Sequence, residues 1–329
     1  MGSTSNPNQD LCDILMELAD YERNVSKDER KYYTYRMAAE TLGTLSEKVK
    51  SGEEAKKLPN IGVKIATMID EFLQTGKLQK LEDFKKDENN VSITLLARVS
   101  GIGSTKAKEL VDAGIKTLED LRKHQDKLTH CQKLGLKYFD DFEKKIPRAE
   151  IIQIEKILKS AIKELNSDYV VTICGSYRRG KEESRNINVL ITHPEYTSKD
   201  AEKKTVSLKA IVECLEKKRL ITDTISLGST KFMGVCRLVE EKGKPFRKLN
   251  IQFTLYDQYY CAMLALTGSA LFNMNIRARA RKKKYTLNDY ELKRHTTEGH
   301  PGETVKITCE EDIFKILDLP YKDPKDRNM

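Results

Sequence analysis

Residues 169–192 read YVVTICGSYRRGKEESRNINVLIT, and this stretch decides the fold class of the chain. Apolar, β-branched runs at 169–174 and 186–192 predict two strands. Between them, Gly175-Ser176 precedes Arg178 and Arg179 where a helix is expected to begin. A hydroxyl, backbone amides and guanidinium groups therefore converge at one turn, an arrangement that can cradle a triphosphate.

The segments on either side extend this pattern. Apolar positions from Glu150 to Leu165 recur at helical spacing, and runs at 232–239 and 249–255 predict two more strands. Strands mixed with helices imply an α+β domain with its own sheet. From Asp257 onward the chain is expected to return to helix, loops and a short polar tail.

The first quarter of the chain is helical by pattern. Apolar residues between Leu11 and Phe84 recur at helical spacing, and the polar stretch from Lys85 to Asn90 is expected to be a linker. Two segments, LPNIGVKIA at 58–66 and VSGIGSTKA at 99–107, share a Gly-rich turn that opens a helix. Two such hairpins favour phosphate binding through the amides at each helix start over ordinary helix capping.

One position of the first hairpin differs from the second. Asn60 stands where the second hairpin has Gly101. Asparagine is the least costly residue other than glycine at positive φ, so the turn is expected to survive.

Composition favours an anionic partner. The 329 residues include 59 Lys plus Arg against 50 Asp plus Glu, a formal net charge of +9, which indicates nucleic acid before membrane as the partner.

No stretch is long and apolar enough for a membrane-spanning helix, and the first ten residues, MGSTSNPNQD, do not have the pattern of a signal peptide. We therefore expect a soluble, intracellular protein without a membrane partner. Seven cysteines lack CxxC spacing, which disfavours both a zinc site and a disulfide framework.

Several motifs together resemble polymerase family X, the DNA polymerases of the polymerase beta type. They are GSYRRG, VLITHP, KFMGVCRL, DQYYCAMLALTGSALFN, YKDPKDR, the two hairpins and GIKTLEDLRK. The resemblance covers nearly the whole chain. It implies a gap-filling enzyme of base excision repair, with a helical domain that removes 5′-deoxyribose phosphate.

The fold implied by the resemblance is α+β. An all-helical N-terminal region with two helix-hairpin-helix motifs precedes a nucleotidyltransferase-type palm with a mixed β-sheet and a C-terminal α/β subdomain. The expected divisions are a flexible tail at 1–10, a lyase-like domain at 11–86, a helical DNA-binding subdomain at 87–147, the palm at 148–255, and a nascent-base-pair-binding subdomain at 256–329.

The residues that carry the family's polymerase chemistry are replaced. The positions of Asn186, Asn188 and Asn250 are aspartates that hold two Mg²⁺ ions in the resembled family, and Asn250 also stands for the carboxylate that helps to deprotonate the primer hydroxyl. Hard dications select anionic oxygen, so we expect Mg²⁺ binding to be weak or absent and polymerase activity to be lost. Glu182 and Glu183 could lean in as substitutes, but solvated surface charges are the favoured interpretation.

The lyase chemistry is replaced as well. Met68 stands at the position of the family's Schiff-base lysine, and a thioether cannot form an imine. Lys64 and Lys80 lie nearby and are expected to contact phosphate rather than to react. Lys31 and Tyr35, with Lys64, match the family's pocket for a 5′ phosphate.

Other binding residues are implied by the resemblance. Arg148, Ser176, Arg179 and Asn273 match contacts to the incoming nucleotide, and Arg185, in place of a small residue, could substitute electrostatically for a missing metal. The aromatic pair before the TGS turn is Ala265-Leu266 here, and Ala270 replaces an acid. DNA contacts are expected from Lys31, Tyr35, Lys64, Lys80, Gly101, Gly103, Lys106 and Arg277. Backbone carbonyls of Lys56, Leu58, Ile61, Ala97, Val99 and Ile102 match sites for K⁺ or Na⁺.

We therefore expect a catalytically inert, monomeric relative that binds gapped, nicked or 5′-phosphorylated DNA and, as a further ligand, a deoxynucleoside triphosphate. By resemblance it would reside in the nucleus, with the cytoplasm as a second location. The main alternative is an active repair polymerase and lyase. A third is a chain whose acids were deliberately changed to asparagine.

Overall fold

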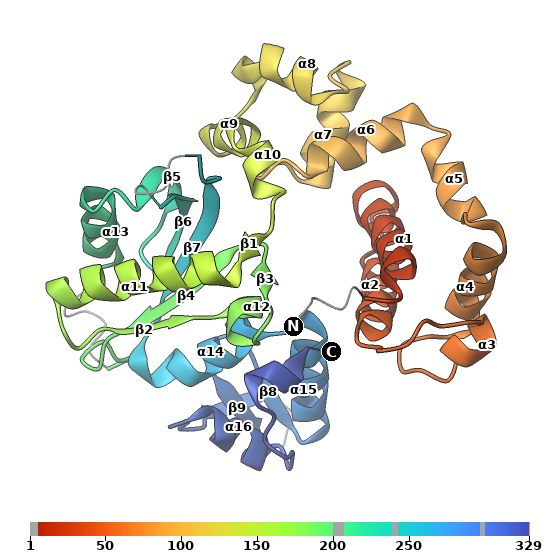
Figure 1. Ribbon diagram of the computed structural model, residues 1–329. Coiled ribbons are helices and arrows are strands. Elements are labelled where there is room, and N and C mark those ends of the chain that lie inside the picture. The colour runs from red at the N-terminus through yellow and green to blue at the C-terminus, as the bar shows by residue number, and fades with distance from the viewer. Residues whose placement is uncertain (1–5, 200–206, 239–242, 297–299, 329) are drawn as a thin grey trace. The chain divides into compact units, whose positions relative to one another are not determined.

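The computed structural model describes residues 6–199, 207–238, 243–296 and 300–328 (Figure 1). The chain divides into two compact units, one ending at Phe139 and the other running from Asp140 to Asn328. Within the described ranges, no helix combines the length and apolarity needed to cross a bilayer. All seven cysteines are free, and Cys12, Cys174, Cys236 and Cys261 are buried.

The first unit is all helical, as predicted. Its elements are α1 (Gln9–Tyr21), η1 (Glu22–Ser26), α2 (Glu29–Gly43), α3 (Gly52–Ala55), α4 (Val63–Thr75), α5 (Gln79–Lys85), α6 (Glu88–Ala97), α7 (Ser104–Asp112), α8 (Leu118–Lys123), η2 (Gln125–Lys127) and α9 (His130–Lys137). One apolar core joins α1, α2 and α4 around Leu15, Leu42 and Ile69. A second core joins α6 and α7 around Leu96 and Leu110.

Two predictions about the ends of helices are wrong. The prediction of a flexible tail at 1–10 is wrong for the last residues of that range. Helix α1 begins at Gln9, and the Asn8 side chain is buried. Asn8 Nδ2 donates to the Glu47 carbonyl at 2.8 Å, and Asn8 Oδ1 accepts from the Val49 amide. Residues 1–5 lie outside the described ranges. The linker expected from Lys85 to Asn90 shrinks to two residues, because the Asp87 side chain caps α6.

The second unit is built on a mixed five-stranded sheet. Its strands are β2 (Val170–Ile173), β4 (Ile187–Thr192), β5 (Ile221–Leu227), β6 (Lys231–Cys236) and β7 (Arg247–Phe253), in the order β2-β4-β7-β6-β5. β4 and β7 are parallel, and the other neighbours are antiparallel. The four strands expected from sequence are confirmed near their predicted bounds, and β5 is the strand that pattern reasoning missed.

Helices and short strands surround this sheet. They are α10 (Phe139–Phe142), β1 (Ile146–Pro147), α11 (Arg148–Leu165), α12 (Gly175–Arg178), β3 (Glu183–Ser184), α13 (Leu208–Lys217), η3 (Tyr256–Gln258), α14 (Tyr259–Thr267), α15 (Ala270–Lys282), α16 (Glu310–Ile316) and η4 (Pro324–Arg327). A second sheet joins β8 (Tyr285–Leu287), β9 (Leu292–His295) and β10 (Pro301–Thr304). The C-terminal segment thus holds strands where the pattern predicted loops.

The two faces of the main sheet are covered unequally. Burial alternates residue by residue along β7, so Leu249, Ile251 and Phe253 lie in the core that α11 and α13 complete. On the opposite face, α14 packs over Leu190 through Tyr259 and neighbouring residues. The start of β4 is left partly open on that face, and this opening positions the candidate site.

A buried ion pair ties α11 to β7. Arg247 donates to both carboxylate oxygens of Glu150, at 2.7 and 2.8 Å, and the two side chains are 4 and 5% exposed. Glu150→Ala is expected to lower the free energy of unfolding of this unit by about 3–5 kcal/mol, because the guanidinium is left buried without its anion. Urea unfolding followed by circular dichroism measures the loss. Glu213→Ala removes the exposed partner of Lys209 on α13 and should cost under about 1 kcal/mol; equal losses would contradict the prediction.

Candidate functional site

Two asparagine side chains meet across the parallel strands β4 and β7. Asn188 and Asn250 are paired in register, and Asn250 Nδ2 donates to Asn188 Oδ1 at 2.9 Å. Both side chains are half-buried on the partly open face of the sheet, whereas Asn186 lies exposed just before β4. The structure thus brings two of the three predicted positions into direct contact. Each amide satisfies a polar group of the other, an arrangement that two ionised carboxylates could not adopt without a cation or a shared proton.

The turn that was expected to cradle phosphate lies beside this pair. Gly175 opens α12 at φ +66, and a Cβ there would stand 3.0 Å from Asn188 Nδ2, so glycine allows the close approach. Ser176 Oγ donates to Ser184 Oγ at 2.8 Å. Arg148 donates to the Tyr177 carbonyl at 2.7 Å and lies over its ring. Ser176 and Arg148 are therefore held near the turn by internal contacts.

The matched arginine of the turn is tied to the end of the chain. Arg179 Nε donates to Asn328 Oδ1 at 2.9 Å, and Asn328 Nδ2 donates to the Arg179 carbonyl at 3.0 Å. A further bond runs from Arg179 to the Thr267 carbonyl at 2.5 Å. Asn328 was not singled out from sequence, because no local pattern links residues 149 positions apart.

The C-terminal segment is anchored by a neighbouring buried arginine. Arg327 is fully buried, donates to Glu310 at 2.7 Å and lies over the rings of Phe272 and Phe314. Glu310 also accepts from Arg178 at 2.5 Å. The buried Glu310 carboxylate thus links Arg178 of the Gly-Ser turn to Arg327, which directly precedes Asn328 in the C-terminal segment.

Two basic residues are neighbours of the asparagines along the chain. Arg185 is exposed next to Asn186, and Lys248 lies on the same face of β7 as Asn250, two residues away. Burial lowers the pKa of Lys248. Sequence reasoning missed Lys248, whose alternation with buried neighbours was the available signal. Glu183 makes an exposed ion pair with Lys145 at 3.2 Å, in keeping with a solvated surface charge.

Asn273 lies on α15. Its Nδ2 donates to the Ala265 carbonyl at 2.7 Å, so the side chain joins the end of α14 to α15. This bond uses a backbone group and does not depend on the residue type at 265.

The two hairpins adopt the same backbone. Asn60 and Gly101 have φ of 66 and 90, and the helix N-caps Gly62 and Gly103 have φ of −90 and −89. The expectation that asparagine would preserve the first turn is confirmed. The carbonyls matched to monovalent cations lie around these turns: Lys56, Leu58, Ile61, Ala97, Val99 and Ile102.

Lys106, an expected DNA contact on the helix that follows the second hairpin, donates to Glu109 at 3.3 Å.

A buried carboxylate organises residues that the sequence resemblance matched to a 5′-phosphate pocket. Glu22 is 1% exposed and accepts from Lys80 Nζ at 2.5 Å, and Lys80 also donates to the Tyr35 hydroxyl at 3.0 Å. Lys31 Nζ lies 3.7 Å from the second oxygen of Glu22, which has no hydrogen-bond partner within the described ranges. Although burial opposes it, hydrogen bonding to Glu22 and Tyr35 raises the pKa of Lys80. Lys80 is therefore a fixed ammonium and a poor nucleophile.

Met68 and Lys64 lie on α4. Met68 packs at the edge of the apolar core of the first unit, while Lys64 is exposed one turn earlier. The lysine-rich surface near the first hairpin thus keeps cations but offers no free amine at the position of Met68.

The basic segment from Arg277 to Lys284 is partly used inside the fold. Arg277 pairs with Asp289 at 2.5 Å, Arg279 donates to the Leu317 carbonyl at 2.9 Å, and Lys283 pairs with Asp318. The segment is therefore less available to DNA than its composition suggests, and a contact from Arg277 must compete with Asp289.

A mixed sheet with a Gly-Ser turn beside paired side chains on parallel strands, together with two helix-hairpin-helix motifs, defines a chain of the nucleotidyltransferase-palm class with a helical N-terminal unit. Four family models match successive segments: helix-hairpin-helix domain at 6–78, fingers domain of DNA polymerase lambda at 94–143, DNA polymerase beta palm at 145–256, and DNA polymerase beta thumb at 262–328.

Two curated relatives extend these matches. DNA polymerase lambda of Arabidopsis thaliana is 32% identical across 98% of this chain and 62% of its own length, and that of Rattus norvegicus is 31% identical across 93% and 54%. The chain thus spans somewhat more than half the length of these relatives. Taken with the four matched segments, they support a place for the chain in polymerase family X.

Proposed function

We propose that this chain, of the polymerase beta type within its family, binds gapped, nicked or 5′-phosphorylated DNA without polymerase or lyase activity. The observation that carries the proposal is the hydrogen bond between Asn188 and Asn250. Where two-metal phosphoryl transfer needs anionic oxygens, the strands present two neutral amides that satisfy each other.

The residues present do not fit a pair of Mg²⁺ ions. Asparagine offers one neutral carbonyl oxygen, and in this pair the oxygen of Asn188 already accepts a hydrogen bond. Arg185, which directly precedes Asn186 in the chain, adds a cation to this segment, which disfavours dications further. Arg185 and Arg179 instead supply cations to which triphosphate oxygens could dock without reacting.

The lyase proposal rests on a separate observation. Lys80, an amine of the matched pocket, is held as an ammonium by Glu22 and Tyr35, and Met68 replaces the expected nucleophile. An imine forms only from a neutral amine, so the pocket is suited to hold a phosphate and not to cleave the sugar.

The backbone carbonyls at the two hairpins are proposed to bind K⁺ or Na⁺, because the identity of a side chain hardly affects a backbone carbonyl as a ligand.

The second candidate function is an active repair polymerase, which the names of the relatives favour. One assay separates the two. With one-nucleotide-gapped DNA, Mg²⁺ and triphosphates, we expect a salt-sensitive gel shift and no primer extension. Extension at the rate of an ordinary repair polymerase would establish the alternative. Family membership also leads us to propose a nuclear, monomeric protein.

Contact with the 5′ phosphate predicts a specific salt effect. Lys64→Ala is expected to weaken binding to 5′-phosphorylated gapped DNA and to reduce the salt slope by about 0.9, since one phosphate contact is lost. Fluorescence anisotropy across a salt series measures the slope. Lys123→Ala on α8, whose lysine pairs with Glu119, is the control and should leave the slope unchanged. An unchanged slope for Lys64→Ala would remove this residue from the interface.

A further inference from the structure

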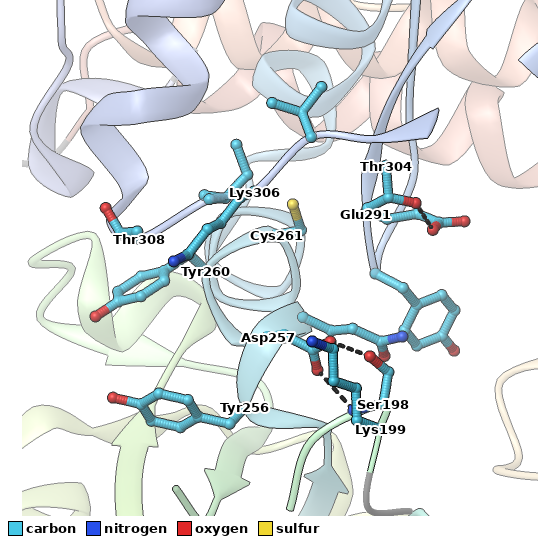
Figure 2. Close-up of a pocket in the computed structure, with 14 residues that line it drawn as sticks. Ser198, Lys199, Tyr256, Asp257, Tyr260, Cys261, Glu291, Thr304, Lys306 and Thr308 are labelled. Atoms are coloured by element: carbon cyan, nitrogen blue, oxygen red, sulfur yellow. Dashed lines mark hydrogen bonds between the residues drawn. The ribbon is translucent and has the colours of Figure 1, made fainter. Parts of the chain in front are cut away.

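A large pocket lies in the second unit, among residues to which neither the sequence motifs nor the matched family positions assign a role (Figure 2). Its volume is about 770 Å³, within the range of roughly 300–1,000 Å³ that is typical of small-molecule sites. The walls come from the loop at 198–199, from η3 and α14, from the turn at 290–291, and from the chain at 304–308.

Three tyrosines supply flat surfaces in this pocket. Tyr256 and Tyr290 are 40 and 39% exposed, and Tyr260 is half-buried beside them in the lining. Tyr259 packs edge-on against Tyr260 with ring centroids 5.4 Å apart, which fixes the orientation of the Tyr260 ring. Exposed aromatic rings in a concave site are surfaces on which a nucleobase can stack.

The charges of the pocket favour an anion. Lys199 and Lys306 line it, and neither ammonium group is in an ion pair with another described residue. The acids are already engaged: Asp257 accepts from the backbone amide of Ser198 at 3.2 Å and from its hydroxyl (Figure 2). Two lysines are therefore left for a ligand.

The second acid of the pocket is held in an ion pair. Glu291 pairs with Lys293 at 2.8 Å and accepts from Thr304 Oγ1 at 2.8 Å, drawn as a dashed line in Figure 2. The hydrogen bond from Lys293 lowers the pKa of Glu291, so the carboxylate stays ionised within its own pair. It does not compete for Lys199 or Lys306.

We propose that this pocket is a second nucleotide-binding site, separate from the amide pair, which takes a nucleotide by stacking its base on the tyrosines and pairing its phosphate with Lys199 and Lys306. The nucleotide is either free or part of a single strand, since both carry the same base and phosphate. An acidic peptide would use the lysines but not the flat rings. The proposal rests on the proposed nucleic-acid function for this choice of ligand.

Isothermal titration calorimetry with the full chain in EDTA tests the site. The probes are dAMP, a six-nucleotide oligothymidylate, inorganic phosphate and hexaglutamate. We expect dAMP or the oligonucleotide to bind at least roughly tenfold more tightly than phosphate, the contribution of one stacked base. An oligonucleotide that binds more tightly than dAMP indicates a strand as the source, and equal affinities indicate a free nucleotide. Hexaglutamate binding as tightly as either nucleotide probe would overturn the proposal in favour of a peptide site.

Variants assign the binding to this pocket. Lys306→Glu and Tyr256→Leu, both at solvent-accessible positions, are expected to weaken nucleotide binding about tenfold. Lys217→Glu on α13 and the exposed Tyr33→Leu on α2 are the matched controls and should stay within about twofold. Losses equal to those of the controls, or no binding by the unaltered chain, would overturn the site. Gapped-DNA binding measured in parallel distinguishes failure of this site from failure of the proposed function.

Discussion

Changing Asn186, Asn188 and Asn250 together to aspartate is expected to give the chain Mg²⁺-dependent primer extension at least roughly a hundredfold above its unaltered level. The reason is electrostatic, because the loss of even one preorganised stabiliser of transition-state charge costs about that factor. The three carboxylates would supply the anionic oxygens that two-metal phosphoryl transfer needs. Primer extension on one-nucleotide-gapped DNA measures the gain.

The same variant should show a metal effect that does not depend on turnover. In the unaltered chain the side chains of Asn188 and Asn250 are joined by a hydrogen bond of 2.9 Å. Two carboxylates about 4 Å apart would repel each other by about 4 kcal/mol at an effective dielectric constant of 20. The triple variant is therefore expected to melt at a lower temperature in EDTA and to recover in Mg²⁺.

A matched control separates the site from added charge. Gln252→Glu places one carboxylate on the same face of β7, two residues beyond Asn250, without completing a site. It should show neither extension nor recovery of melting temperature in Mg²⁺. The interpretation of the amide pair would be refuted by a triple variant that is indifferent to Mg²⁺, or by unaltered protein that fills gaps at an ordinary rate.

Met68→Lys is expected to create a borohydride-trapped adduct with an abasic 5′ end where the unaltered chain gives almost none. Met68 lies at the edge of the apolar core on α4, and partial burial lowers the pKa of a lysine, which favours the neutral amine that forms an imine. Lys80 cannot take this role, because Glu22 and Tyr35 hold it as an ammonium. Denaturing electrophoresis after borohydride reduction measures the adduct.

Two further variants control for this experiment. Met68→Gln keeps a side chain of similar length without an amine and should give no adduct. Lys80→Ala in the Met68→Lys background should retain trapping while weakening binding of the 5′ phosphate. Efficient trapping by the unaltered chain, abolished by Lys80→Ala, would instead make Lys80 the nucleophile and contradict the role assigned to it by its contacts.

Much of the fold could be predicted from local patterns. Runs of apolar and β-branched residues located four of the five strands of the main sheet, and the spacing of Ile151, Ile154 and Leu158 located α11. The likeness of two nine-residue segments indicated both hairpins, and the tolerance of asparagine for positive φ predicted the turn at Asn60. These features depend on neighbours in the chain, so periodicity and residue type suffice to find them.

The amino-acid sequence by itself determined which chemical groups are present: neutral amides at positions 186, 188 and 250, methionine at position 68, and an excess of cations. Only the tertiary structure decided which groups meet. Asn188 bonds to Asn250, Glu22 holds Lys80, and Asn328 holds Arg179, across 62, 58 and 149 positions of the chain. Such pairs depend on strand register and on packing between distant segments. Neither can be read from a local sequence pattern, because both depend on residues far apart in the chain.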